Sequence, residues 1–595
     1  MPPTANTTTA APRKSAAPAA SALPDDVREQ LDADIAALRE GTRGWAHVTL
    51  GQRARLLERV RAEVIRVAEE WADTASTLKG IEPGHALRGE EWLGGPYAVL
   101  GALDAYADSL HALANGRSPL AKVKATAAPG DRVALHTFPR NAVDGILLSG
   151  FSTEVWLRPG TSEQQARTEA GLAQLAPTVS GGVGLVLGAG NVPSIPVLDV
   201  LYELLAHNRV AILKLNPTMD GLRSVFDRAL APLIEPGFVR IETGAGDVGA
   251  YLTGHPGIDH VHITGAEATF DAIVWGPSST PAAKAAMTRR KREGRPLLKK
   301  PITAELGGVS PIIVVPGRWT DADLRFQAEH IVTMRLQNSG HNCIAGQVVV
   351  VSDDWPQRDA FQAALRDAYA KAPQRPVWYP GSDAKLEAVE SAYADAEWLC
   401  GRTRALVTIE EGQDATALET TEYFSPVLGV VGLRGLGQEF LDAAVAYANE
   451  RLAGTLGANV LIDPATQKAL GDGFERAIAE LRYGAIAINA WTAFVFLTPT
   501  ATWGAFPGNP LDAIGSGTGI VHNGFLISAV ERSVARGPFR PFPRSLAGGT
   551  RSVLPKPPWF VSSRTGAQVS EGFTRFQMDR SWPKLMRTLA AAFRA

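Results

Sequence analysis

The 595-residue sequence has only two cysteines, Cys343 and Cys400. Two cysteines cannot form a disulfide framework, and they fit a reducing compartment, so we expect a cytoplasmic protein. The sequence also lacks an excess of charge of one sign, because 59 basic and 61 acidic residues leave a net charge of −2. This balance gives no electrostatic basis for binding nucleic acid or an anionic membrane, and we predict neither partner.

Uninterrupted apolar runs and rival catalytic motifs are missing as well. Two long uncharged stretches, 170–198 and 485–510, are interrupted by glycine and proline, so no membrane span is predicted. Residues 1–24 are rich in Ala, Pro and Thr, lack the continuous apolar stretch of a signal peptide, and are predicted to form a disordered tail. There is no Gly-x-Ser-x-Gly elbow, no Walker loop and no cluster of metal ligands, so no metal site is predicted.

The residues that are present have the composition and patterns of a globular α/β enzyme. Apolar residues make up 45% and charged residues 20% of a chain long enough for two or three domains. From Asp25 to about Leu113, apolar residues recur every three or four positions, which predicts helices. Short apolar strands then alternate with helical segments in two sets, at about 183–263 and 311–489. This alternation predicts the α/β class with two doubly wound domains.

A segment between the helices and the first strand set has a different pattern. It contains three apolar runs separated by polar residues, Val133–Phe138, Ile146–Leu148 and Val155–Leu157. Such runs predict a β-hairpin and therefore a small separate β element.

Cys343 is the residue that points most directly to chemistry. Gly340 before it and Ala345-Gly346 after it suggest a tight turn that presents a thiol, and thiolates attack carbonyl carbons. A lone cysteine is more often structural, so this interpretation depends on other motifs. Four of them occur along the chain: Gly188-Ala-Gly-Asn191-Val-Pro, Lys214 at a strand end, Glu305 in Ala-Glu-Leu-Gly-Gly308, and Glu422-Tyr-Phe424-Ser-Pro.

In type and order these motifs resemble those of the aldehyde dehydrogenase superfamily, from about Gln30 to about Phe539. The resemblance implies a cofactor-binding domain, a catalytic domain, a small β oligomerisation element, and assembly into a homodimer or homotetramer. It assigns 25–131 and 179–306 to the cofactor-binding domain, 132–160 to the oligomerisation hairpin, 307–490 to the catalytic domain, and 491–595 to a substrate loop, an oligomerisation strand and a tail.

The resemblance also implies roles for the motif residues. Cys343 matches the nucleophile that forms a thiohemiacetal with an aldehyde, and Asn191 matches a donor to the resulting oxyanion. Glu305 matches the base that activates water to hydrolyse the later thioester. Glu422 and Phe424 match residues that hold the nicotinamide ribose and ring. Taken singly, each of these residues also fits an ordinary structural role.

The cofactor is expected to be NAD or NADP, with a preference for NADP or use of both. Lys214 matches the lysine that contacts the adenosine ribose. Pro217 stands where the family often has a glutamate that repels a 2′-phosphate, so nothing there excludes NADP. The other predicted cofactor contacts are Gly246 and Gly249, in a Gly-x-Gly-x-x-Gly sequence that is a weak signal alone, and Gly265 and Ala266.

The sequence departs from the family pattern at several places. Gly190 replaces the usual tryptophan before the oxyanion asparagine, Val309 stands where lysine is common, and 161–178 and the basic loop 289–300 are insertions. The tail after Phe539 suggests no function from its sequence.

The predicted activity is NAD(P)-dependent oxidation of an aldehyde to a carboxylic acid. Trp491, Phe494 and Phe496 are expected near the substrate and favour an apolar or aromatic aldehyde. The alternative is a CoA-dependent, acyl-transferring enzyme, against which the retained Glu305 argues. A non-catalytic scaffold that binds nucleic acid through 289–300 is a third hypothesis, and intact Cys343 argues against it.

Overall fold

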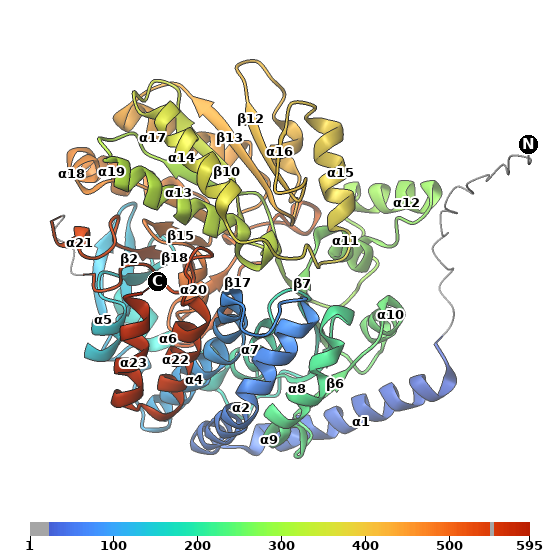
Figure 1. Cartoon of the computed structure of the whole chain (residues 1–595). Helices are drawn as coiled ribbons and strands as arrows, with labels where there is room; N and C mark the ends of the chain where they lie inside the picture. Colours follow the sequence, from blue (N-terminus) through green and yellow to red (C-terminus); the bar gives the residue numbers. More distant parts are fainter. Residues whose placement is uncertain (1–22, 548–551, 595) are drawn as a thin grey trace, which may run out of the picture.

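The computed structural model describes residues 23–547 and 552–594 and contains two large sheets, which occupy the lower and upper halves of Figure 1. The first sheet is parallel, with strand order β6-β5-β4-β7-β8. Its strands are short and apolar because helices cover both faces. They are β4 (Val183–Leu187), β5 (Val210–Lys214), β6 (Val239–Glu242), β7 (His260–Gly265) and β8 (Ile302–Leu306).

Helices from the N-terminal region and from the strand connections bury the first sheet in one apolar core. Thr49 begins the longest of them with a capping box. Its side chain accepts a hydrogen bond from the Gln52 backbone N–H, and the Gln52 side chain accepts one from the Thr49 backbone N–H. The covering helices are α1 (Asp25–His47), α2 (Leu50–Leu78), α4 (Ala98–Ala114), α7 (Ile195–His207), α8 (Arg223–Ala229) and α9 (Ala231–Ile234).

The second sheet has eleven strands in the order β1-β2-β3-β18-β15-β14-β9-β10-β13-β12-β11, and it ends at β11 (Glu397–Leu399). The block from β18 to β12 is parallel, and both faces of this block are buried. Its strands are β9 (Ser310–Val314), β10 (Gly346–Ser352), β12 (Arg404–Ile409), β13 (Val427–Leu433), β14 (Gly457–Leu461), β15 (Ala485–Ile488) and β18 (Val530–Arg536). Its helices are α13 (Asp321–Leu336) and α14 (Arg358–Lys371) in one core, and α17 (Gly437–Glu450) and α19 (Asp472–Glu480) in the other.

The segment expected to be a hairpin is a three-stranded antiparallel unit, β1 (Lys124–Ala128), β2 (Arg132–Phe138) and β3 (Ser152–Leu157). Strand β3 pairs with β18, so the unit extends the large sheet of its own chain. The strand expected at Ile146–Leu148 is wrong, because α5 (Ala142–Leu147) forms there. The Asn141 side chain caps this helix by accepting two backbone N–H bonds, and an apolar run of three residues does not specify a strand.

Two other expectations about local structure are corrected. The basic segment 289–300 is not wholly a loop, since α12 (Pro281–Arg292) ends with four consecutive basic residues. Cations are favourable in the last turn of a helix, and Lys291 also pairs with Asp271 at 2.9 Å. The single helix expected over 465–481 is interrupted at Gly471, whose φ of 50° separates α18 (Pro464–Leu470) from α19.

One buried arginine, Arg53 of α2, holds the segment 161–178 against the domain of the first sheet. The Arg53 guanidinium donates to Gln174 at 2.7 Å and to Asn208 at 2.6 Å, and also to three backbone carbonyls. The insertion contributes α6 (Glu163–Glu169) and a 3-10 turn, so this added segment is packed rather than loose.

The two ends of the chain differ in how much of them is described. The predicted disordered tail lies outside the described residues except for Leu23, which is buried, and Pro24. At the other end, α22 (Gly566–Asp579) packs against α3 (Gly89–Trp92) and α4, and α23 (Trp582–Ala592) packs against α22. Helices α22 and α23 are dark red in Figure 1. Within 23–547 and 552–594, no helix has the length and apolar character needed to cross a bilayer.

Candidate active site

The candidate site lies at the carboxyl ends of the parallel strands of the first sheet. The strand order reverses between β4 and β7, and doubly wound sheets bind ligands at such a point. Asn191 follows β4, Lys214 ends β5, and Gly265-Ala266 follows β7. Glu305 lies in β8, one residue before its end. The topology therefore brings four motifs, far apart in sequence, to one edge.

Cys343 approaches this edge from the second sheet, in the turn between α13 and β10. Asn338 and Ser339 have φ of 54° and 56°, a left-handed conformation that costs non-glycine residues about 1–3 kcal/mol each. Cys343 lines two cavities, one of about 240 Å³ beside the first sheet and one of about 70 Å³ with apolar walls. The thiol therefore stands between a polar and an apolar compartment.

Among the charged groups, Glu305 has the largest effect on the thiol. It lines the 240 Å³ cavity together with Cys343, and Trp503 Nε1 donates a hydrogen bond to its Oε1 at 3.3 Å. Burial raises the pKa of Glu305 to about 8. Burial, followed by the Glu305 charge, raises the pKa of Cys343 well above its ordinary value. Each group thus keeps its proton more strongly than in water.

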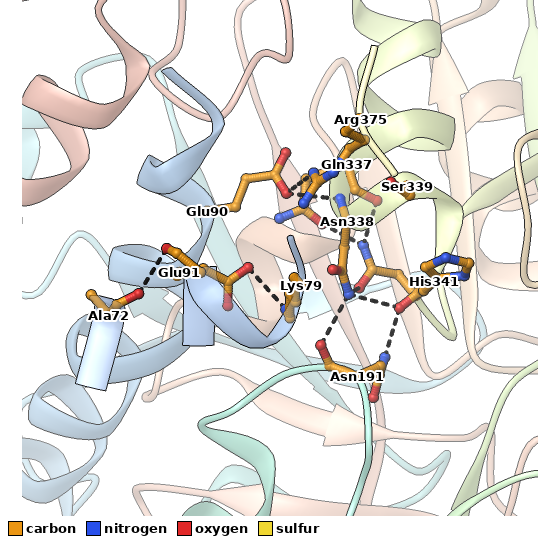
Figure 2. Close-up of polar contacts among 12 residues, drawn as sticks. Ala72, Lys79, Glu90, Glu91, Asn191, Gln337, Asn338, Ser339, His341 and Arg375 are labelled. Carbon is orange, nitrogen blue, oxygen red and sulfur yellow. Dashed lines mark hydrogen bonds and ion pairs between the residues drawn. The ribbon is translucent and has the colours of Figure 1, made fainter. Parts of the chain in front are cut away.

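Asn191 is held beside the turn 337–343, which carries Cys343, by hydrogen bonds of its side chain and its backbone, as Figure 2 shows. Its Nδ2 donates to the His341 carbonyl at 2.9 Å, and Asn338 Nδ2 donates to the Asn191 carbonyl at 3.0 Å. An amide nitrogen has two hydrogens, so one remains for another acceptor. Asn191 lines the 240 Å³ cavity together with Cys343 and Glu305.

A buried charge network supports the same turn from the side of α3, as Figure 2 shows. Glu90 accepts from the Asn338 N–H at 2.8 Å and pairs with Arg375. Next to it, Lys79 pairs with Glu91 at 2.9 Å, with both side chains at most 3% exposed. Burial lowers the pKa of Lys79. No local pattern indicates this network, because Glu90 lies 248 residues from Asn338 and 285 residues from Arg375.

The cavity of about 240 Å³ has the features of a cofactor site. Burial raises the pKa of Glu422 to about 7, and its Oε1 is buried with no hydrogen-bond partner in the described part of the chain. A Cβ at Gly307 would overlap this carboxylate, so the glycine leaves it room. The Phe424 ring lies 4.9 Å from the Tyr379 ring at the cavity wall. A buried acceptor without a partner fits a ligand that donates hydroxyl hydrogen bonds.

Only two of the other six predicted cofactor residues line this cavity. Gly265 and Ala266 line the cavity with Cys343, whereas Lys214, Pro217, Gly246 and Gly249 do not. Lys214 is buried at 7% exposure, has no ion pair or hydrogen bond of its Nζ in residues 23–547 and 552–594, and has its pKa lowered by burial. Pro217 is exposed at the start of a 3-10 turn.

Local packing does not require two of the predicted glycines, but it explains one departure from the family pattern. A Cβ at Gly246 would contact nothing within 4 Å, and one at Gly249 would make only an ordinary contact, so neither glycine is required. At Gly190 a Cβ would lie 2.6 Å from Asn216 and 2.7 Å from Thr218. No side chain fits there, which explains why this chain lacks the usual tryptophan.

The smaller cavity on the other side of Cys343 is walled by aromatic residues. Trp491, Phe494 and Phe496 line it, as does Trp503, which also bonds to Glu305. Sequence reasoning missed Trp503, Trp559, Tyr379 and Lys385. Trp503 follows the predicted aromatic segment closely enough to have been included, whereas the other three gave no signal.

Comparisons with known proteins agree with this arrangement. The model of the aldehyde dehydrogenase family matches residues 160–385, which include Asn191, Glu305 and Cys343. A crystal structure of an NAD-dependent aldehyde dehydrogenase from Sinorhizobium meliloti is similar at a TM-score of 0.56 and 20% identity, covering 86% of each chain. The chain has the aldehyde dehydrogenase fold. The resemblance recognised from the sequence and the predicted fold class are therefore confirmed.

Two further structures show the same fold over most of the chain. A mutant of aldehyde dehydrogenase C from Pseudomonas syringae, complexed with NAD⁺ and octanal, has a TM-score of 0.56 and 19% identity, covering 86% of this chain and 90% of that one. An NADP-dependent enzyme from E. coli has a TM-score of 0.53 and 18% identity, with the same coverage. Both nicotinamide cofactors therefore occur among proteins of this fold.

We predict that Glu90 positions the turn 337–343 as well as stabilising it. Glu90→Ala leaves Arg375 buried without its partner, which costs about 3–5 kcal/mol and should lower the Tm. It also releases the Asn338 N–H, so kcat for aldehyde oxidation should fall about tenfold per folded molecule. The measurements are thermal unfolding, and kcat at a temperature where circular dichroism shows the variant fully folded. Glu29→Ala, an exposed glutamate on α1, is the control. A lower Tm with unchanged kcat would show that Glu90 only stabilises the fold.

Proposed function

We propose that the protein oxidises an aldehyde to a carboxylic acid with NAD or NADP, through a thiohemiacetal and a thioester on Cys343. One observation carries the proposal: the Cys343 thiol lies between an apolar cavity and a polar one, and it shares the polar cavity with the buried Glu305 carboxylate. An aldehyde entering from the apolar side meets the thiol, and the polar cavity on the other side suits the cofactor.

The first step is attack of the Cys343 sulfur on the carbonyl carbon. Glu305, which lines the same cavity, accepts the thiol proton and then releases it to solvent. The C–S bond forms as the carbonyl π bond becomes an oxyanion. The free N–H of the Asn191 amide and the Cys343 backbone N–H donate to this oxyanion, a contribution that typically amounts to about 3–4 kcal/mol per donor.

The residues of the polar cavity fit a nicotinamide cofactor. When bound, the cofactor supplies the hydride acceptor that turns the thiohemiacetal into a thioester. Glu422 would accept from a ribose hydroxyl, because its Oε1 is buried and has no partner within the described chain. Lys214 would face the adenosine end, and Pro217 presents no carboxylate against a 2′-phosphate. We therefore favour NADP or the use of both cofactors.

The second step is hydrolysis of the thioester. Glu305 accepts a proton from water as the water oxygen attacks the acyl carbon, and collapse of the adduct breaks the C–S bond and releases the acid. Glu305 must be ionised for this role. Since burial raises its pKa to about 8, it is mostly protonated at pH 7. The steady-state rate should therefore rise with pH and level off above about pH 8.

The nucleophile is tested by exchanging the two cysteines separately. Cys343→Ser should abolish oxidation and leave cofactor binding unchanged, because a hydroxyl is far harder to ionise than a thiol. Cys400→Ser is the matched control, since Cys400 donates only to the Ala370 carbonyl at 3.3 Å and lines neither cavity. Steady-state kinetics and a cofactor-binding titration give both readouts. Loss of activity in the Cys400 variant alone would overturn the assignment.

The base is tested by Glu305→Gln at pH 9. Removal of the neighbouring charge lowers the pKa of Cys343, so the thiolate still forms, but the amide cannot take a proton from water. We expect a stopped-flow burst of about one equivalent of reduced cofactor, then turnover slower by about 10²–10⁴-fold. The exposed Glu410→Gln is the control. Unchanged turnover would exclude Glu305 as the base, and a requirement of the wild-type enzyme for coenzyme A would replace hydrolysis with acyl transfer.

Cofactor choice is tested at Pro217. Pro217→Glu introduces a carboxylate that can accept from the 2′-hydroxyl of NAD and repels the 2′-phosphate of NADP. The ratio of kcat/KM for NAD to that for NADP should rise by about tenfold or more, equivalent to about 1.4 kcal/mol. Pro217→Gln, which has the same shape without the charge, should change the ratio much less. An equal shift in both variants would mean that loss of the proline, not charge, sets the preference.

A further inference from the structure

The C-terminal tail, 552–594, helps to enclose a third cavity, which is larger than the two at Cys343. This cavity, of about 420 Å³, lies between α4, the segment 138–148, the loop 494–500 and the tail. From the tail, Pro558 and Trp559 and side chains of α22 such as Phe573 and Phe576 form its walls. The structure thus gives the tail a place beside the site, although its sequence suggested no function.

The outer cavity adjoins the apolar pocket at Cys343. Leu93, Phe494, Leu497 and Trp559 line both cavities. Trp559 therefore stands in the shared wall, with its ring 6.2 Å from that of Phe494 and 5.7 Å from that of Phe151. A molecule whose reactive end lies at Cys343 reaches the outer cavity by passing this aromatic wall.

The sizes of the two cavities divide the substrate into two parts. The inner pocket, of about 70 Å³, is far smaller than ordinary small-molecule sites of about 300–1,000 Å³, whereas the outer cavity falls in that range. The inner pocket alone holds only a slender group next to the aldehyde carbon. Most of a larger substrate must lie in the outer cavity.

The charges around the outer cavity are largely compensated by neighbouring side chains. Asp104 pairs with Arg61 at 2.6 Å, Asp108 pairs with Arg140, and Glu58 contacts His111 at 2.9 Å. Asp144 and Arg580 supply two further, opposite charges at the cavity. The lining aspartates Asp104 and Asp108 thus each have an arginine partner, while the wall shared with the Cys343 pocket consists of Leu93, Phe494, Leu497 and Trp559. The cavity therefore suits an apolar chain better than a charged group.

We propose that the C-terminal tail forms a second substrate chamber, which selects aldehydes with long apolar chains. The aldehyde carbon lies at Cys343, the chain passes Trp559, and its distal part is buried against α4 and α22. The inference rests on the proposed aldehyde oxidation and adds a substrate class to it. Burial of each further methylene in the chamber raises kcat/KM until the chamber is full.

The test compares propanal with decanal in three forms of the full-length protein. Wild type should have a kcat/KM at least about tenfold higher for decanal. Ala107→Phe, on the face of α4 that lines the outer cavity, should lower kcat/KM for decanal by about tenfold or more and change that for propanal by less than about twofold. Ala114→Phe, exposed at the end of the same helix, should behave like wild type. Equal values for the two aldehydes in wild type, or equal losses for both in a folded Ala107→Phe, would overturn the proposal.

A second variant and a binding measurement separate the possible failures. If Ala107→Phe does not fold, Trp559→Ala should reduce decanal oxidation selectively, and an unchanged chain-length profile there counts against the chamber. Calorimetric titration with decanoate and propanoate needs no turnover, and wild type should bind decanoate more tightly. Oxidation of both aldehydes without a chain-length preference refutes the chamber alone. Absence of any aldehyde oxidation, with tight decanoate binding, refutes the proposed reaction and leaves an apolar chain site.

Discussion

The burial of the Cys343 thiol and the Glu305 carboxylate beside one cavity is the constraint on which the proposed active site depends. Burial removes the water that would otherwise stabilise both anions, so both pKa values lie above their ordinary range. The same burial makes the pair useful, because a proton can move between them and hydrogen bonds to a developing oxyanion are stronger there. This arrangement requires that β8 of one sheet and the turn before β10 of the other meet at one edge.

The two sheets alone do not place the thiol, because the segment that carries it is irregular and strained. Asn338 and Ser339 are left-handed, and they keep this conformation because Glu90 accepts the Asn338 N–H while Asn338 bonds to Asn191 and His341. Glu90 in turn belongs to α3, against which the C-terminal helix α22 packs. Segments from both ends of the chain therefore contribute to the position of the nucleophile and to the walls of the substrate cavities.

The parts of this structure that the sequence predicted are those with short-range signals. Helix α13 and strand β13 belong to the alternation predicted over about 311–489, because their apolar spacing and flanking turns are local. The motifs around Asn191, Glu305 and Cys343 were likewise visible in order, and the topology brings them together. Ile146–Leu148 was wrong because three apolar residues cannot distinguish helix from strand. The Glu90 network, Trp559 and the tail helices depend on contacts between segments hundreds of residues apart, which no local pattern encodes.

The central claim is that the acyl group of the substrate becomes attached to Cys343 during turnover. The most direct measurement is an acid quench of the wild-type protein within the first turnover with decanal and cofactor at pH 9, followed by mass spectrometry of the peptides. The account predicts a decanoyl group on the peptide that contains Cys343, and only when cofactor is present. An acyl group on Cys400, one that forms without cofactor, or no acylated peptide while reduced cofactor accumulates would contradict it.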